Sequence, residues 1–251
     1  MHQRATKGFL DQGFIKRWPS APKVIFTAAP NCFADEMTKR FSIDLGIPIV
    51  SMSQLVEQVR DRAGQDAEFS HKFFLRARDM IEAGDEDALV REKIYVKLLR
   101  LTAAAQEGFV LTDFPKNVAQ AELLEEYKGG MNAFVNLSMP DEVLVDIEAS
   151  KVDCQDCGRT YYNSDVVLPE SGIRVERFMP ADGNCDDCGS SNFGPGSNPA
   201  QFEQELADYK EQRDELLAFY NHFGLLVDFE LRNGYQDYEK VKRAIQYNLK
   251  H

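Results

Sequence analysis

Short apolar runs alternate with longer amphipathic stretches along most of the chain. Apolar runs bounded by Gly, Pro or Asn are typical of buried parallel strands, and the amphipathic stretches have the spacing of helices that cover a sheet. The expected strands are 23–28, 49–51, 109–112, 133–137 and 225–231, and the expected helices are 35–45, 54–83 with a break near 63–64, 89–107, 119–127, 201–223 and 238–249. This alternation predicts an α/β fold with a parallel sheet covered by helices on both faces.

The segment 150–198 interrupts the alternation. It is rich in Cys, Asp, Gly, Ser and Pro, and it contains no long amphipathic stretch. We therefore expect a small inserted domain here. The expected division of the chain is an N-terminal arm at 1–22, a core formed by 23–149 and 199–251, and the insert.

The N-terminal arm has an apolar side and a basic side. Its apolar residues recur near helical spacing and its charges are mostly positive. The apolar residues are Phe9, Leu10, Phe14 and Trp18, and the basic residues are Arg4, Lys7, Lys16 and Arg17. Such a segment is typical of a mitochondrial transit peptide. It is also typical of an arm that docks on another protein subunit. We favour a retained arm held by a partner subunit. The basic character favours a mitochondrial location, with a cytoplasmic or axonemal assembly as the alternative.

Composition and charge narrow the classes of function. The 251 residues are 43% hydrophobic and 11% aromatic, which is enough for a packed core. No apolar run approaches the roughly 20 residues of a membrane-spanning helix, so an integral membrane protein is not expected. Lys and Arg number 29 against 41 Asp and Glu, which gives a net charge of −12. An acidic surface repels phosphate backbones, so no nucleic acid partner is expected.

Four of the five cysteines form two Cys-x-x-Cys pairs within the insert, Cys154 with Cys157 and Cys185 with Cys188. The first residues contain no apolar stretch of secretory-signal length, so we expect reduced thiols. Two such pairs predict a tetrahedral structural zinc site, with four unmetallated buried thiols as the alternative. Cys32 stands alone, and we interpret it as a small buried filler.

Several words of the sequence, in the same order, resemble the adenylate kinase family from residue 23 to about 249. They are Gly46-Ile47-Pro48 with Ser51, the run 109–116 with Gln120-Ala121, the run 139–145, the two cysteine pairs with Gly158-Arg159 and Gly189, and Tyr209, Leu216, Tyr220 and Gly224. The resemblance implies a P-loop nucleoside monophosphate kinase fold. It also implies a monophosphate-binding arm near 51–85 and a zinc-bearing lid at 150–198.

The phosphate-binding loop is where the chain departs from the family. The family's loop reads G-x-x-G-x-G-K-G-T, and it falls on residues 28–36. Every glycine is replaced, and Phe33 brings a bulky ring to one of these positions. Ala34 stands in place of the lysine, and Glu36 in place of the hydroxyl that helps to hold Mg²⁺. Asp35 and Glu36 add two carboxylates at a helix N-terminus, which opposes the binding of phosphate.

Most other phosphate contacts implied by the resemblance are also replaced. The family's lid arginines fall on Ile147 and Lys151, and the arginines after the lid fall near Gly194 and on Glu205. The arginine and the threonine of the monophosphate arm fall on Glu57 and Met52. The acid that polarises a Mg²⁺-bound water falls on Thr112. We expect the neighbouring Asp113 to face the opposite side of its strand. Lys116 keeps the charge of a family arginine without its bidentate fork. Gln120 matches a residue that contacts adenine in the family, and the alternative interpretation is an exposed helical glutamine.

The retained features support folding and the replaced ones bind phosphate. We therefore expect a catalytically degenerate adenylate-kinase-like protein, with no catalytic residues and no Mg²⁺-ATP, acting as a structural or accessory subunit of a larger assembly. Two alternatives remain open. One is an active enzyme that converts ATP and AMP to two ADP. The other is a sensor that binds AMP or ADP through Lys116 and Gln120 without turnover.

Overall fold

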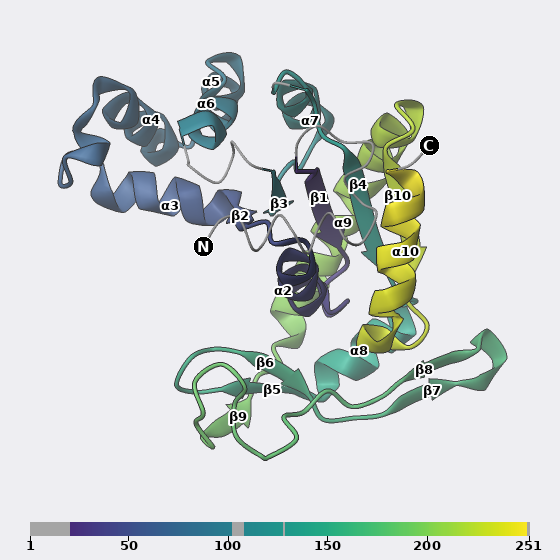
Figure 1. Cartoon of the computed structure of the whole chain (residues 1–251). Helices are drawn as coiled ribbons and strands as arrows, with labels where there is room; N and C mark the ends of the chain where they lie inside the picture. Colours follow the sequence, from purple (N-terminus) through teal and green to yellow (C-terminus); the bar gives the residue numbers. More distant parts are fainter. Residues whose placement is uncertain (1–20, 102–107, 128, 250–251) are drawn as a thin grey trace.

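The core is a parallel five-stranded sheet in the computed structural model, which describes residues 21–101, 108–127 and 129–249 (Figure 1). The strand order is β10-β4-β1-β3-β2. The strands are β1 (Lys23–Ala28), β2 (Ile49–Ser51), β3 (Phe109–Thr112), β4 (Ala133–Ser138) and β10 (Leu226–Glu230). Every pairing in this sheet is parallel. The expected α/β fold of the nucleoside monophosphate kinase type, with helices around a parallel sheet, is confirmed.

Helices cover both faces of this sheet. They are α2 (Ala34–Leu45), α3 (Met52–Arg62), α4 (Lys72–Ala83), α5 (Glu86–Arg91), α6 (Ile94–Leu101), α7 (Val118–Glu125), α8 (Asp141–Ala149), α9 (Pro199–His222) and α10 (Tyr238–Asn248). The side chains of β1 alternate between two hydrophobic clusters. Val24 packs with Met37 of α2 and Tyr238 of α10 on one face, and Ile25 belongs to the cluster on the other face.

The predicted helix boundaries are correct at some places and wrong at others. The predicted break near 63–64 is confirmed, because α3 ends at Arg62 and α4 begins at Lys72. The predicted continuous helix over 89–107 is wrong. Lys93 has a left-handed backbone with φ 57°, and this residue separates α5 from α6. The helix α8, which begins after Pro140, was not predicted.

Two small antiparallel sheets form the insert of residues 150–198, which we call the lid. One has the order β6-β5-β9, from β5 (Lys151–Cys154), β6 (Thr160–Tyr162) and β9 (Phe193–Pro195), and the other pairs β7 (Val166–Leu168) with β8 (Ile173–Val175). Figure 1 shows these strands below α2 and α10, where α8 leads out of the core. Each lid sheet is too small to bury a core by itself, so the lid depends on packing against the core and on its cysteine cluster.

Residues 1–20 of the expected N-terminal arm, including Trp18, lie outside the described residues, so the prediction for the arm stays a prediction. In the part of the chain that the structure does describe, no helix combines the length and the hydropathy needed to cross a lipid bilayer.

Candidate functional site

A cleft of about 890 Å³ lies at the carboxyl ends of the central strands, next to the loop between β1 and α2. In open parallel sheets, ligands bind where loops leave these ends. The walls come from the loop, from residues 112–116 after β3, from α9 and from the lid. The resemblance places the phosphate-binding loop of the family at this cleft.

The loop keeps the backbone turns of a glycine-rich loop without its glycines. Asn31 and Phe33 both have left-handed backbones, with φ 63° and 55°, and both stand where the family has glycine. Asparagine adopts this conformation readily, whereas an aromatic residue does so at a cost of about 1–2 kcal/mol. Surrounding contacts must therefore hold Phe33 in place.

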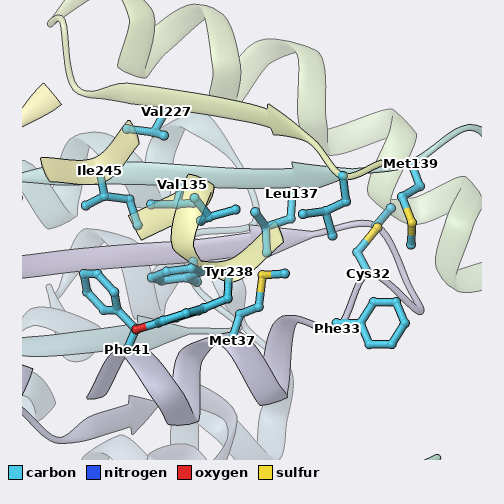
Figure 2. Packing of buried hydrophobic residues seen from close by; sticks show 14 of the residues in the cluster. Cys32, Phe33, Met37, Phe41, Val135, Leu137, Met139, Val227, Tyr238 and Ile245 are labelled. Carbon is cyan, nitrogen blue, oxygen red and sulfur yellow. The ribbon is translucent and has the colours of Figure 1, made fainter. Parts of the chain in front are cut away.

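Those contacts come from the lid. The ring of Phe33 is only 4% exposed and packs edge-on against Tyr162 at 5.2 Å and Phe178 at 5.9 Å between ring centroids. Figure 2 shows Phe33 at the end of the buried cluster, near Cys32, which lies beside Met139. Cys32 is 1% exposed and burial raises the pKa of its thiol, so the prediction of a small buried residue is confirmed.

The first turn of α2 carries a carboxylate that is paired with the lid. Arg159 donates to Glu36 at 3.0 Å, and it also pairs with Asp186 at 3.4 Å and with Asp187. The side chains of Arg159 and Glu36 are 11% and 16% exposed. Burial raises the pKa of Glu36, although Arg159 and Lys39 favour its carboxylate. A guanidinium–carboxylate pair thus occupies the helix N-terminus where the family holds phosphate and Mg²⁺.

The loop is tied to the base of the lid by a second carboxylate. Asn31 donates to Glu148 of α8 at 3.0 Å, and the hydroxyl of Tyr162 donates to Asn31 at 3.4 Å. Glu148 is buried, and it also accepts from the backbone N–H of Asn198 at 2.7 Å, where α9 begins. The polar groups of the loop are therefore bonded to protein on the side that faces the lid.

Charge in the cleft is acidic on balance. Among the described residues that line it, six are carboxylates: Asp35, Glu36, Asp113, Asp187, Glu205 and Asp208. Four are cations: Lys39, Lys116, Arg159 and Arg213. Of these four cations, Lys116 is the one with no ion pair among the described residues. A site that holds several phosphates needs a cationic excess, which this cleft lacks.

The positions that carry arginines in the family supply little positive charge here. Ile147 is buried in the hydrophobic core, and Lys151 pairs with Glu148 at 3.8 Å. Glu57 is exposed on α3, where it pairs with Arg60 at 2.8 Å. Gly194 is part of β9, and Glu205 lines the cleft as an acid.

Gln120 is buried, so the interpretation as an exposed helical glutamine is wrong. The side chain is 4% exposed, and both ends of its amide are bonded. Its oxygen accepts from the backbone N–H of Lys116 at 2.7 Å, and its nitrogen donates to Glu86 at 2.5 Å. Glu86 in turn accepts from the hydroxyl of Tyr95 at 2.7 Å. Gln120 thus links α7 to α5 and α6, and it is not among the residues that line the cleft.

Asp113 lies in the cleft, so the expectation that it faces away is wrong. β3 ends at Thr112, and Asp113 has φ 63°, so strand alternation does not extend to it. Its carboxylate accepts from the hydroxyl of Ser51 at 2.7 Å. Both Thr112 and Asp113 line the cleft, which places an acid one residue after the position the family uses.

The four cysteines of the two pairs meet at one point in the lid. Their sulfurs all lie within 4.8 Å of one another, with Cys154 and Cys188 at 3.6 Å and Cys157 and Cys185 at 3.5 Å. Tetrahedral Zn–S bonds of about 2.3 Å place sulfurs about 3.8 Å apart, whereas a disulfide needs about 2.05 Å. The geometry fits four thiolates around one metal ion such as zinc.

Both pairs use the same backbone turn. Gly158 donates its N–H to the carbonyl of Cys154 at 2.8 Å, and Gly189 does the same to Cys185 at 2.7 Å. The two glycines have φ 76° and 74°, a conformation that favours glycine, and this explains why each pair reads Cys-x-x-Cys-Gly.

The clustered thiols differ in acidity: backbone hydrogen bonds favour the thiolates of Cys157 and Cys188, but burial and hydrogen bonds with neighbouring cysteines raise the pKa of both, whereas the pKa of Cys185 is lowered. Burial opposes ionisation of Cys185, but the hydroxyl of Tyr161, at 3.5 Å, and backbone N–H groups lower its pKa to about 6. A thiol that ionises near neutral pH is a ready metal ligand, because the thiolate is the form that coordinates. The donor set and its geometry therefore suit a structural metal, and Cys185 is the ligand whose pKa favours the coordinating form.

The curated proteins that are similar to this chain include several adenylate kinases. No protein-family model matches the chain. It is 25% identical over 231 residues to an adenylate kinase of Archaeoglobus fulgidus, covering 89% of this chain and 95% of the relative. It is 23% identical over 229 residues to an adenylate kinase of Rickettsia akari, covering 90% and 98%. Against adenylate kinase 1, chloroplastic, of Arabidopsis thaliana, it is 27% identical over 248 residues, covering 93% and 81%.

Proposed function

We propose that this homologue of the adenylate kinases does not transfer phosphoryl groups, and that it serves as a structural or accessory subunit of a larger protein assembly. The observation that carries the proposal is the ion pair between Glu36 and Arg159, together with the ring of Phe33 beside it. Phe33 and Glu36 stand at loop positions that hold phosphate and Mg²⁺ in the family, and here both are engaged with the lid.

Phosphoryl transfer depends on positioning and on stabilisation of negative charge. A triphosphate at this loop would meet Asp35 and Glu36 at the helix N-terminus, with Ala34 in place of the loop lysine. Arg159, the nearest guanidinium, is already shared among Glu36, Asp186 and Asp187. Binding would require the pair of Glu36 with Arg159 to break, and the largely buried carboxylate of Glu36 would then lose its partner.

An active enzyme is the main alternative, because the family relationship extends along about nine tenths of the chain. A nucleotide sensor that uses Lys116 and Gln120 is a weaker one. Gln120 is bonded to Glu86 and to the backbone of Lys116, so a base would have to replace both hydrogen bonds. Lys116 alone offers a single point charge.

We also propose that the four lid cysteines form a structural zinc site. We assign zinc to Cys154, Cys157, Cys185 and Cys188, with residues 150–198 as the domain that it stabilises. The zinc would supply folding free energy to a segment with little core of its own. In this division, 23–149 and 199–251 form the core, and 51–85 is the vestigial monophosphate arm.

The assembly contact is proposed for the N-terminal arm at 1–22, in a mitochondrial complex. Its support is the sequence pattern of Phe9, Leu10, Phe14 and Trp18 beside basic residues. Deleting residues 1–20 and purifying the protein from its native source tests this contact. We expect the protein to leave its complex with thermal stability and metal content unchanged. Unfolding on deletion would place the arm in the core of this chain instead.

Calorimetric titration with Mg²⁺-ATP tests the proposed absence of nucleotide chemistry. The wild-type chain should give no binding heat. A variant that restores the family's loop, with Phe33→Gly, Ala34→Lys, Asp35→Gly and Glu36→Thr, should gain affinity, because it removes the two carboxylates and supplies the lysine. Micromolar binding by the wild-type chain, lost in Lys116→Ala, would contradict the proposal.

A further inference from the structure

The side chains that replace the phosphate-binding loop reach across to the lid. Phe33 packs against Tyr162 and Phe178, Asn31 accepts from Tyr162, and Glu36 pairs with Arg159. Each of these contacts joins the core to the lid. The loop residues that left the family's pattern are therefore the residues that hold the lid against the core.

The polar half of this contact is built on the cysteine pairs. Arg159 lies two residues after Cys157, and Asp187 lies between Cys185 and Cys188. Arg159 bonds Glu36 of the core and Asp187 of the lid, and Asp187 also accepts from Lys39 of α2 at 3.3 Å. The first cysteine turn thus presents the cation Arg159 to Glu36 of α2, and the second presents the anion Asp187 to Lys39 of α2.

The apolar half begins at the same place. The hydroxyl of Tyr161 donates to the sulfur of Cys185, and its ring stacks on Phe178 at 5.9 Å. Phe178 lies 5.9 Å from Phe33 and 5.5 Å from Tyr235, which follows β10 in the core. A continuous row of rings runs from the cysteine cluster to the core.

We propose that these contacts form a clasp that keeps the lid closed on the core without any nucleotide, and that metal at the four cysteines sets whether the clasp forms. Lids of phosphotransferases close around substrate and reopen to release product. Here the closing interactions come from Phe33 and Glu36 of the chain itself. The clasp proposal concerns the position of the lid, and it does not depend on whether the cleft catalyses a reaction of nucleotides.

Metal binding affects the clasp because one ion holds both cysteine turns. Bound metal holds Cys157 and Cys185 at one centre, and with them Arg159 and Asp187 at the spacing that α2 requires. Without metal, the two turns lose their common anchor, since a lid of short strands has little other core. The clasp residues on the core side, Phe33 and Glu36, would then lose their partners together.

Hydrogen–deuterium exchange of the full-length protein, free of nucleotide, tests the clasp. In the zinc-loaded protein, amides of residues 31–37 should exchange slowly. Removal of zinc with a chelator should accelerate their exchange roughly tenfold or more, together with exchange in the lid, while the strands of the central sheet stay protected. If chelation accelerates exchange in 150–198 and leaves 31–37 unchanged, lid and loop are not coupled and the proposal is wrong.

Two substitutions test the core side of the clasp with zinc bound. Glu36→Lys places a cation against Arg159 and Lys39, and Phe33→Ala removes the ring between Tyr162 and Phe178. Both should accelerate exchange at 31–37 and at 159–162. Glu57→Lys, which reverses an exposed pair with Arg60 on α3, is the matched control and should change neither segment. Equal exchange in Glu36→Lys and the control would overturn the proposal. The chelation experiment needs no substitution and decides the matter if a variant fails to fold.

Discussion

Phe33 offers a quantitative test of the loop, because its ring stabilises the fold while its backbone strains it. Phe33→Ala removes a ring that is 4% exposed and packed between two lid aromatics. Truncation of a buried phenylalanine costs about 3–5 kcal/mol of unfolding free energy, including about 0.5–1.5 kcal/mol for each aromatic pair. We expect a loss in this range.

Phe33→Gly removes one more carbon and should nevertheless cost less. The φ of 55° is unfavourable for a residue with a Cβ by about 1–2 kcal/mol, and glycine relieves this strain. The expected loss for Phe33→Gly is therefore about 2–4 kcal/mol, smaller than that for Phe33→Ala.

Urea unfolding followed by circular dichroism measures both variants, with Phe223→Ala as the control. Phe223 is 55% exposed, and its truncation should cost less than about 1 kcal/mol. If glycine costs more than alanine, the left-handed backbone at Phe33 is wrong. If both variants lie within about 0.5 kcal/mol of the wild type, the ring is not buried under the lid.

Two further predictions concern the metal and the acid stability of the chain. Metal analysis should return one zinc per molecule, and Cys185→Ser should lose the zinc and disorder 150–198 while the central sheet stays folded, as read by circular dichroism and proteolysis; a disulfide without metal would contradict this. Buried Asp237 accepts from the backbone N–H groups of Arg232 and Asn233 at 2.6 and 2.7 Å, and these bonds and Lys240 lower its pKa although burial opposes this. A carboxyl group whose pKa is lowered by folding stabilises the fold at pH values above its unfolded pKa of about 3.9, and this stabilisation is lost as pH falls through the folded pKa. Asp237→Asn should therefore cost about 2 kcal/mol of unfolding free energy at pH 7 and progressively less below pH 4. A loss of stability that does not depend on pH would refute this prediction.

The fold was largely predictable because its signals are local. Apolar runs such as 109–112 marked the strands, and the two Cys-x-x-Cys-Gly words marked both the metal ligands and the turns that place them. α8 was missed although Pro140 followed by Asp141 and Glu142 is a good helix start, and its apolar residues recur at helical spacing. The signals for this helix were therefore present in the sequence and were not recognised.

The remaining errors come from contacts between distant residues. No Gly or Pro announces the left-handed turn at Lys93, so the sequence favours one long helix there. Burial of Gln120 depends on Glu86, 34 positions earlier. The pair of Glu36 and Arg159 spans 123 positions, and neither side chain signals the other. The replacement of the loop's glycines and lysine was readable from sequence, whereas the contacts of Phe33 and Glu36 with the lid needed the structure.

The most direct test of the central claim is the amount of ADP formed from ATP and AMP with Mg²⁺, followed by phosphorus NMR on the purified full-length chain. We expect no ADP above a protein-free control, because the cleft lacks the loop lysine and most of the family's arginines and contains more carboxylates than cations. Steady ADP formation by the wild-type chain, at a rate that falls away in Lys116→Ala, would contradict the account.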